Sequence, residues 1–270
     1  MIVFLFLERV FVDKGDRILI VGHCGLIGSS LWNRLREYYR LYGFDLVALN
    51  DDGFSENVDM IIHCSSYCVI REVIKNPQLM VENIKMTYKV MEKAKEDNAK
   101  VVLMSSSRLN SLGNSPYTVG KQFMENISDA YKDCYGIDRV IIRPETIWGY
   151  KKEDDRVIPN WIKLSKNNED IVVYGDQTKE LSPLFVEDFT NEIIKIISNF
   201  DNFKNKCPIT ITGKPMKVID IISIIKDFYR SRSKVVFLDP EMSQPQTCSD
   251  REEEDIILDN KLKERLGFNK

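Results

Sequence analysis

The chain has 270 residues and a mass of 31.4 kDa, which is enough for one large α/β domain or for a main domain with a smaller second part. Its 38 basic and 41 acidic side chains give a net charge of −3 at pH 7, and no segment is basic enough to follow a phosphate backbone. This charge balance argues against a nucleic-acid partner.

Six cysteines and two histidines are scattered along the chain without any Cys-x-x-Cys pair. Their spacing predicts neither a metal site nor a disulfide framework, and a reducing, cytoplasmic setting fits best. The apolar run 2–12 contains Glu8 and Arg9 and is far shorter than the ~20 residues that span a bilayer. We therefore expect no membrane segment, and we interpret residues 1–16 as a short N-terminal segment at the edge of the fold.

In the first half of the chain, apolar runs of strand length alternate with longer stretches of helical period. The expected strands are 17–21, 46–49, 60–64, 101–104 and 140–142, and the expected helices are 26–42, 79–96 and 117–135. Such alternation predicts parallel strands joined by right-handed helical crossovers. The nearly continuous apolar strands agree, because a parallel sheet is covered on both faces. We therefore expect an α/β fold with a doubly wound parallel sheet of the Rossmann type.

From about residue 148 the pattern loosens into shorter elements. The expected strands are 171–174, 209–212 and 235–238, and the expected helices are 188–198, 218–229 and 260–266. We expect a first domain over 17–150, to which part of 160–200 returns, and a smaller, mixed α/β substrate-binding lobe over 151–270.

The first strand ends in a glycine-rich turn that opens into a helix, Gly22-His23-Cys24-Gly25-Leu26-Ile27-Gly28. Backbone N–H groups and the positive end of a helix bind a pyrophosphate in such a turn. Gly22 would permit the tight turn, Gly25 the close approach of a phosphate, and Gly28 the contact of helix with strand. The spacing differs by one residue from the G-x-G-x-x-G fingerprint. The turn and its context predict a dinucleotide-binding domain.

The end of the second strand decides between the two nicotinamide cofactors, because an acidic side chain there bonds the ribose 2'-hydroxyl of NAD. Asn50 stands where we first expect this acid, and Asp51 follows it. No basic residue follows closely to hold the 2'-phosphate of NADP. Either NAD or NADP is expected, with NAD slightly preferred, although Asp51 and Asp52 could equally be plain loop carboxylates.

A candidate proton-transfer pair stands at Tyr117 and Lys121, one helical turn apart. A phenol has an ordinary pKa near 10 and needs a nearby cation to act as a base at neutral pH, which a lysine at this spacing supplies. A chain with 11 tyrosines would contain such a pair by chance. The context adds weight, because Ser107 follows a strand at the edge of the sheet where doubly wound folds bind ligands.

With these motifs together, the chain resembles the extended short-chain dehydrogenase/reductase family, in particular its nucleotide-sugar epimerases, dehydratases and reductases. The resemblance runs from about residue 17 to residue 268. Besides the glycine turn, it rests on these segments: Asp59-Met60-Ile61-Ile62-His63-Cys64-Ser65-Ser66, Lys75-Asn76-Pro77 with Asn83, Val102 to Ser107, Ser115 to Lys121, Arg143 to Gly149, Val157-Ile158-Pro159, Tyr174-Gly175-Asp176, Phe185 to Asp188 and Leu266-Gly267-Phe268.

The resemblance implies an NAD(P)-dependent nucleotide-sugar epimerase or 4-keto reductase that transfers a hydride at a sugar carbon. Tyr117 would exchange a proton with the sugar, Lys121 would bind the nicotinamide ribose and lower the tyrosine pKa, and Ser107, or Ser106 one residue earlier, would hydrogen-bond the reacting oxygen. The other implied cofactor-binding residues are Gly22, Gly25, Leu26, Ile27, Gly28, Cys64, Ser65 and Pro144, and the implied substrate-binding residues are Thr146 and Lys179. The partner would be a nucleotide-diphosphate sugar, and helices 79–96 and 117–135 would form a homodimer by analogy with relatives.

The chain also departs from the family pattern. Only nine residues separate Ser107 from Tyr117, and Arg108-Leu109-Asn110 replaces the acidic pair of sugar dehydratases, which disfavours dehydration. Leu181 stands where the family commonly has an arginine for the nucleotide diphosphate. Lys179 could replace that arginine only as a point charge, and the other candidates are Arg71, Arg156 and Arg251.

Two alternatives to a sugar enzyme stay open from the sequence. One is a reductase of a non-sugar ketone, and the other is a non-catalytic dinucleotide-binding sensor or scaffold. The intact set of Ser107, Tyr117 and Lys121 argues against the second, because a sensor need not keep a proton-transfer group. His63, at the end of a buried strand, is interpreted as structural.

Overall fold

The structure is a computed structural model that describes residues 16–45, 53–110, 114–150, 156–175, 179–206, 208–239 and 255–269. The expected N-terminal edge segment lies almost wholly outside the described residues, as do Asn50, Asp51 and Arg251. In the part that is described, no helix combines the length and hydropathy that crossing a membrane requires.

The chain divides into two compact units, and each is described by itself. Unit 1 contains Met1–Ser105, Pro116–Arg143 and Thr190–Ile209. Unit 2 contains Ser106–Ser115, Pro144–Phe189 and Thr210–Lys270. The chain therefore passes from one unit to the other several times.

The largest sheet has seven strands in the order β13-β10-β5-β4-β3-β1-β2. Its strands are β1 (Arg17–Val21), β2 (Arg40–Phe44), β3 (Met60–His63), β4 (Lys100–Met104), β5 (Arg139–Pro144), β10 (Ile209–Gly213) and β13 (Ile256–Leu258). The pairs β1–β2, β1–β3, β3–β4 and β4–β5 in unit 1 are all parallel. The expectation of a Rossmann-like α/β fold with a parallel sheet is confirmed.

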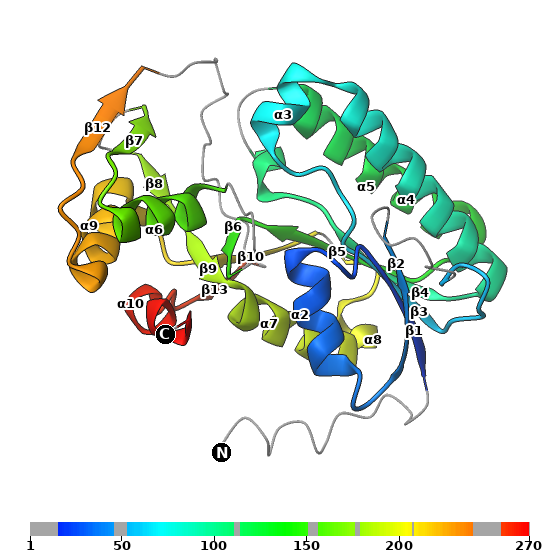
Figure 1. Cartoon of the computed structure of the whole chain (residues 1–270). Helices are drawn as coiled ribbons and strands as arrows, with labels where there is room; N and C mark the ends of the chain where they lie inside the picture. Colours follow the sequence, from blue (N-terminus) through cyan, green and yellow to red (C-terminus); the bar gives the residue numbers. More distant parts are fainter. Residues whose placement is uncertain are drawn as a thin grey trace. The chain divides into compact units, whose positions relative to one another are not determined.

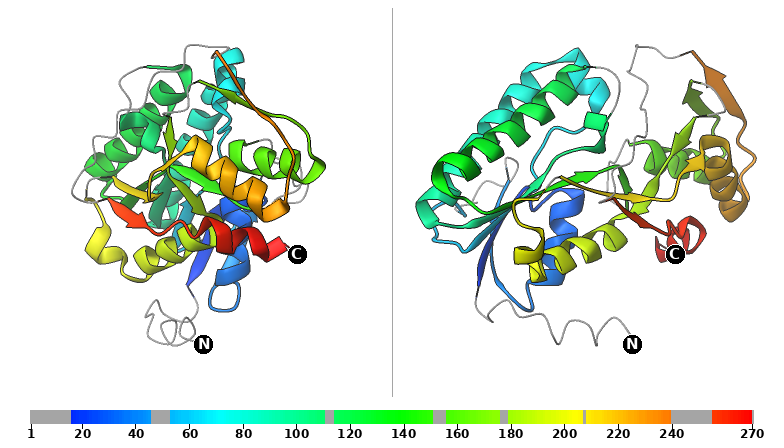
Figure 2. Two further views of the ribbon diagram at one scale, coloured as in Figure 1. Left: turned by 90° about the vertical axis from the view of Figure 1, so that its left-hand side faces the viewer. Right: turned by 180° about the vertical axis from the view of Figure 1, so that it is seen from behind.

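Helices cover both faces of the sheet in unit 1. The helices that contribute to this unit are α2 (Leu26–Leu35), α3 (Ile70–Lys75), α4 (Gln78–Asp97), α5 (Pro116–Tyr135), the part of α7 (Val186–Ser198) from Thr190 onward, and α8 (Phe200–Phe203). The long helices α4 and α5 lie side by side on one face, with α2 on the other (Figure 1, Figure 2). Because both faces are covered, the apolar run of β1 is buried throughout, with Leu19, Ile20 and Val21 at 0% exposure.

The second strand lies earlier in the chain than the predicted range 46–49. The predicted helix to residue 42 ends at Leu35, and β2 occupies Arg40–Phe44 beside β1. A Cβ at Gly43 would lie 2.8 Å from the His23 ring, so this glycine lets the strand approach the turn after β1. The apolar and aromatic residues of β2 matched helical spacing by coincidence, which hid the strand. The second strand therefore ends at Phe44, well before Asn50.

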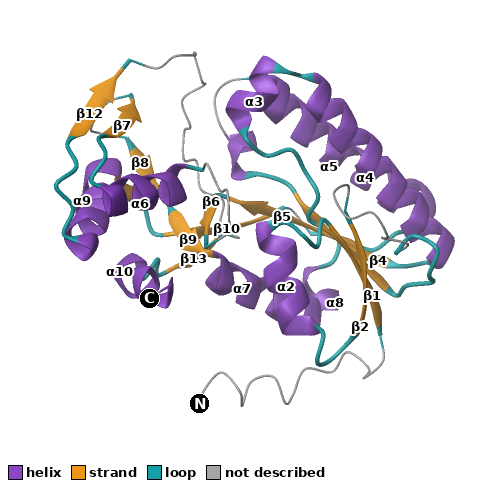
Figure 3. Cartoon of the chain, viewed as in Figure 1, coloured by secondary structure: helices purple, strands orange, loops and turns teal. Residues whose placement is uncertain are grey.

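Unit 2 is built from short strand pairs (Figure 3). Parallel pairs join β6 (Thr146–Trp148) to β9 (Pro183–Phe185) and β7 (Ile171–Tyr174) to β12 (Val235–Leu238), and an antiparallel pair joins β8 (Glu180–Leu181) to β11 (Met216–Lys217). Its helices are α6 (Val157–Asn167), the first turn of α7, α9 (Val218–Tyr229), α10 (Leu262–Arg265) and two 3-10 helices, η1 (Ser107–Asn110) and η2 (Leu266–Asn269). Trp148, Trp161 and Phe185 belong to its hydrophobic core.

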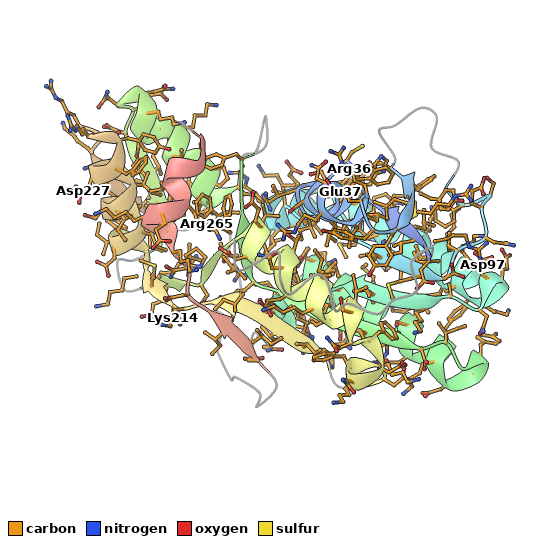
Figure 4. The ribbon with its side chains drawn as sticks, turned by 90° about the horizontal axis from the view of Figure 1, so that it is seen from below. Arg36, Glu37, Asp97, Lys214, Asp227 and Arg265 are labelled. Carbon is orange, nitrogen blue, oxygen red and sulfur yellow. The ribbon has the colours of Figure 1, made fainter. Side chains whose placement is uncertain are left out.

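An ion pair fixes the C-terminal helix within unit 2. Arg265, labelled in Figure 4, pairs with the carboxylate of Asp188 in the first turn of α7, and its guanidinium lies 5.3 Å from the ring centre of Phe185. Tyr150 donates its hydroxyl to the carbonyl oxygens of Arg265 at 3.2 Å and Leu266 at 3.0 Å. These contacts hold α10 and η2 against the core of this unit.

Candidate active site

The glycine-rich turn has the backbone geometry that a pyrophosphate site needs. Gly22 has a φ of +89°, and its N–H donates to the Phe44 carbonyl at 2.7 Å. A Cβ at Gly22 would lie 2.6 Å from the Ser65 nitrogen, and a Cβ at Gly28 would collide with the Gly22 carbonyl. Gly25 is the N-cap of α2, and no described side chain caps this helix. The turn is thus closed by backbone, and the helix N-terminus can receive an anion.

Asp45 is the acidic residue at the end of the second strand. It directly follows Phe44, and its Oδ2 accepts a hydrogen bond from the Cys24 N–H at 3.1 Å. This is the position of a ribose-binding acid in doubly wound folds. Asp45 was not among the predicted residues, because the expected second strand ran over 46–49. The pair Phe44-Asp45, an aromatic residue followed by an acid, was the available signal.

The end of β3 forms another wall of the turn. The Cys64 N–H donates to the Val21 carbonyl at 2.8 Å, and the Ser65 backbone lies against Gly22. Burial raises the pKa of the Cys64 thiol to about 12, so the thiol keeps its proton at neutral pH. Both predicted residues contribute through their backbone, at the carboxyl end of the strand.

His63 is 1% exposed, and its Nε2 shares a hydrogen bond of 3.1 Å with the Thr87 hydroxyl. Burial, with the positive charge of Lys121 as a smaller cause, lowers the pKa of His63 to about 3. The imidazole is therefore neutral at working pH, which agrees with the structural role expected for it.

Tyr117 and Lys121 lie one turn apart on the buried face of α5, at 5% and 2% exposure. The Lys121 ammonium donates to the Met104 carbonyl at 3.1 Å, at the end of β4. Burial lowers the pKa of Lys121 to about 8, although nearby Cys68, Glu125 and Cys64 act in the opposite direction. The ammonium thus keeps its proton at neutral pH and can stabilise an adjacent phenolate.

The parts found in unit 1 meet at the carboxyl ends of neighbouring parallel strands. The glycine turn follows β1, Asp45 follows β2, Cys64 follows β3, and Lys121 is bonded to the last residue of β4. Ligands bind at this edge of a doubly wound sheet. The turn residues Leu26 and Ile27, which were also predicted, open helix α2 at the same edge.

The remaining predicted residues belong to unit 2. Ser107 opens η1 and is half-buried, whereas the hydroxyl of Ser106 is engaged as an acceptor from the Arg108 N–H at 3.2 Å. Pro144 ends β5 and Thr146 begins β6, and both are half-buried.

Leu181 is 9% exposed and packs in the core of unit 2, so no cation occupies its position. Lys179 is exposed, and its side chain lies beside Gly175. The Arg156 guanidinium donates to the Ile147 carbonyl at 3.1 Å, next to Thr146. Of the arginines that the sequence offered as replacements, Arg156 is the one that unit 2 places beside a predicted substrate residue.

The sequence matches the NAD dependent epimerase/dehydratase family over residues 18–211. It is 23% identical over 287 residues to UDP-glucuronic acid decarboxylase 1 of Danio rerio, covering 87% of this chain and 66% of that protein. It is 22% identical over 227 residues to the UDP-glucuronate 4-epimerase of Thermodesulfobacterium geofontis, covering 75% of this chain and 68% of that protein. The chain spans about two thirds of the length of these curated relatives.

Solved structures share the fold. An epimerase from Methanothermobacter thermautotrophicus aligns with a TM-score of 0.79 at 18% identity, over 97% of this chain and 89% of that chain. The UDP-glucuronic acid 4-epimerase of Bacillus cereus, solved with UDP-glucuronic acid and NAD, aligns with a TM-score of 0.78 at 21% identity, over 93% and 92%. The resemblance inferred from the motifs is confirmed, and because the family match covers well over half of the chain, this chain belongs to the NAD dependent epimerase/dehydratase family.

Proposed function

We propose that this chain is an NAD-dependent enzyme that epimerises a nucleotide-diphosphate sugar, with Tyr117 as the group that gives and takes the proton. The observation that carries the proposal is the buried pair of Tyr117 and Lys121 at the strand edge that also bears the glycine turn. The named relatives, a UDP-glucuronate 4-epimerase among them, support this reaction class.

The residues present fit a dinucleotide. The turn Gly22 to Gly28 would hold the pyrophosphate at the N-terminus of α2, and the space that a Cβ would fill at Gly22 and Gly28 is closed by backbone. Asp45 would bond the adenosine ribose, which favours NAD over NADP because a carboxylate repels a 2'-phosphate. Bound NAD would supply the hydride acceptor and donor.

The protein's own part in the reaction is proton transfer and orientation. Tyr117 would exchange its phenolic proton with the sugar oxygen, and the Lys121 ammonium would favour the phenolate. Ser107, in unit 2, is proposed as a hydrogen-bond partner of the substrate, because the hydroxyl of Ser106 already accepts a backbone hydrogen bond.

Unit 2 offers Arg156 for the sugar diphosphate. Its guanidinium is fixed by the Ile147 carbonyl beside Thr146, and a planar guanidinium can bind a phosphate through two N–H groups. Lys179 offers only a point charge. We therefore expect Arg156→Ala to raise the KM for a UDP sugar more than Lys179→Ala does, with kcat changed less than KM.

The test is a binding and turnover panel with UDP, GDP, dTDP and CDP sugars in the presence of NAD or NADP. An epimerase interconverts two sugars without net consumption of cofactor, whereas a 4-keto reductase consumes NADH or NADPH in proportion to product. A ketone reductase would ignore nucleoside diphosphates, which would then fail to raise the Tm. Binding of NAD without turnover of any substrate would favour the sensor.

Tyr117→Phe is the decisive variant. Loss of the proton-transfer group should lower kcat by about 10²- to 10⁴-fold. The Kd for NAD should change little, because the phenol ring remains. Calorimetric titration with NAD beside the turnover assay separates the two effects. Full activity of this variant would remove Tyr117 from the reaction.

We propose a homodimer formed through α4 and α5. Large apolar side chains are exposed on both helices, with Val81 at 40% and Tyr88 at 54% on α4, and Val119 at 53% and Phe123 at 52% on α5. Val119 and Phe123 are one turn apart and share a helix face. Phe123→Glu should convert a dimer into a monomer in light scattering, and a monomeric unaltered chain would refute the proposal.

A cytoplasmic location is also proposed. Among the described residues, Cys24, Cys64, Cys68 and Cys134 form no disulfide, as expected in a reducing compartment. Fractionation of cells that express the tagged protein tests this directly.

A further inference from the structure

His23, Cys24 and Asp45 form a group of metal-binding side chains at the glycine turn. One ligand atom from each residue lies within 4.8 Å of the other two, and all three residues are half-buried, within reach of an ion from solvent. His23 and Cys24 are the two residues between Gly22 and Gly25, and Asp45 directly follows the neighbouring strand β2. The spacing of cysteines in the sequence gave no sign of this group, because the third ligand lies 21 residues from Cys24.

The separation of the sulfur and nitrogen ligand atoms matches tetrahedral zinc coordination. The Cys24 Sγ lies 3.5 Å from the His23 Nε2. With Zn–S near 2.3 Å and Zn–N near 2.0 Å, the two ligand atoms on a tetrahedral ion are about 3.5 Å apart. A thiolate, an imidazole and a carboxylate are three ligand types that zinc accepts, and a fourth position stays open for water.

The imidazole is already oriented. Its ring centre lies 5.2 Å from that of Trp32, and the ring lies against the Gly43 backbone, where a Cβ would lie 2.8 Å away. Asp45 is also fixed, because it accepts the Cys24 N–H at 3.1 Å. Little side-chain freedom would be lost when a metal binds, which favours affinity.

The charges are also compatible. A thiolate and a carboxylate together balance the two positive charges of a zinc ion, so the N-terminus of α2 would not face a net cation.

We propose that His23, Cys24 and Asp45 form a site for one soft divalent cation such as Zn²⁺, and that the metal and the dinucleotide exclude each other. The exclusion rests on the proposed function, because the pyrophosphate would occupy the turn that carries His23 and Cys24, and the adenosine ribose would need Asp45. Zinc would then act as a reversible competitor of NAD at the cofactor site.

The test uses the full chain, freed of metal with a chelator and titrated with cobalt chloride. A tetrahedral site with one thiolate gives a sulfur-to-cobalt charge-transfer band in the near ultraviolet, and zinc chloride should displace the cobalt and remove the band. Cys24→Ser should abolish the band and weaken zinc binding by at least about 10- to 100-fold. Mutation of a residue that only hydrogen-bonds to a metal ligand already weakens metal binding by that factor, and Cys24 would be a ligand itself. Cys134→Ser, at an exposed cysteine on α5, is the matched control and should keep the band.

A second measurement tests the exclusion. Saturating zinc should raise the apparent Kd for NAD in the unaltered chain and in Cys134→Ser. For Cys24→Ser, the Kd for NAD is first measured without metal. Zinc should change this Kd little, because the proposed site has lost its thiolate. Circular dichroism confirms that each variant is folded before titration.

The outcomes are distinct. A band that persists in Cys24→Ser, or no band in the unaltered chain, overturns the metal site. Zinc and NAD that bind together without mutual effect overturn the exclusion. If cobalt binds through Cys24 while neither nicotinamide cofactor binds, the metal site stands and the proposed function fails. If NAD binds and cobalt does not, the proposed function stands and the metal site fails.

Discussion

The two units bury different kinds of polar side chain. Among the described residues, the buried polar side chains of unit 2 are all serine or threonine hydroxyls: Ser106, Ser115, Ser165, Ser182, Thr210, Thr212 and Ser233. In unit 1 the buried polar side chains also include a histidine and an asparagine, His63 and Asn83. All the described charged side chains that are buried belong to this unit as well: Lys93, Lys121, Glu125 and Arg139.

This difference agrees with the roles proposed for the two units, which are proton transfer in unit 1 and substrate binding in unit 2. A buried ionisable group costs stability unless it is paired, so a protein keeps one where its charge or proton is needed. Of the buried charges of unit 1, Lys121 belongs to the proposed proton-transfer pair, whereas Lys93 and Arg139 are paired with Asp97 and Asp129. Unit 2 packs apolar side chains with small hydroxyls, which suits a unit whose proposed task is to bind a sugar nucleotide.

The largest expected effect concerns the ion pair that joins α5 to β5 in unit 1. Arg143 donates two hydrogen bonds to Glu125, at 3.0 and 2.8 Å, and Glu125 is 3% exposed. Glu125→Ala would leave the Arg143 guanidinium, whose side chain is 12% exposed, without this carboxylate, which costs about 3–5 kcal/mol of unfolding free energy. Urea denaturation measures the loss.

The matching pair in unit 2 should matter less. The side chains of Asp188 and Arg265 are each 14% exposed, and Arg265 retains the Phe185 ring and Glu187 at 3.9 Å. We expect Asp188→Ala to cost about 1.5–3 kcal/mol. Hydrogen exchange should show the weakened protection in unit 1 for the first variant and in unit 2 for the second. Equal losses would contradict the contrast between the units.

The next effect is the pH dependence that Lys121 gives to unit 1. Its folded pKa of about 8 lies below the ordinary value of 10.5 because of burial. Below pH 8 the lysine is charged in both states and the burial cost is complete. Between pH 8 and 10.5 the unfolded chain holds a proton that the folded chain has released, so folding becomes more favourable as the pH rises.

Lys121→Met removes this titration. Relative to the variant, the unaltered chain should gain about 2 kcal/mol of unfolding free energy between about pH 7 and pH 9.5. Lys85→Met is the control, because the Lys85 side chain is 65% exposed. Urea denaturation at both pH values provides the comparison. A pH dependence that Lys85→Met removes and Lys121→Met retains would show that the buried lysine is not its source.

A smaller effect separates two glycines of the same turn. A Cβ at Gly28 would collide with the Gly22 carbonyl, whereas a Cβ at Gly25 would lie 3.1 Å from it. Gly28→Ala should cost about 1–3 kcal/mol through overpacking, and Gly25→Ala less. Both should weaken NAD binding, Gly25→Ala because its methyl group would meet the phosphate. Thermal unfolding and NAD titration together distinguish the two roles, and an unchanged Tm for Gly28→Ala would refute the steric argument.

The sequence predicted these glycines, a parallel α/β sheet, and the pair of Tyr117 and Lys121, because local patterns carry that information. It did not predict Asp45. The residues of β2 read equally well as helix or strand, and only the pairing with β1 decides between them. The group of His23, Cys24 and Asp45 was missed for a related reason, since parallel strands bring together residues that are far apart in the chain.

The smallest expected effect concerns a buried hydroxyl of unit 2 and whether it contributes to the free energy of unfolding. The Ser165 hydroxyl is buried and has no hydrogen-bond partner among the described residues. A buried polar group without a partner costs stability, so Ser165→Ala should leave the unfolding free energy unchanged or raise it by up to about 1 kcal/mol. Ser182→Ala, at another buried serine of this unit, is the control for the loss of a hydroxyl alone. Ser165 lies on α6, whose core face packs Trp161 and Ile162, so its hydroxyl faces mainly apolar side chains. If Ser165→Ala lowers the free energy of unfolding by more than about 1 kcal/mol in urea denaturation, the hydroxyl stabilises this unit and the prediction is wrong.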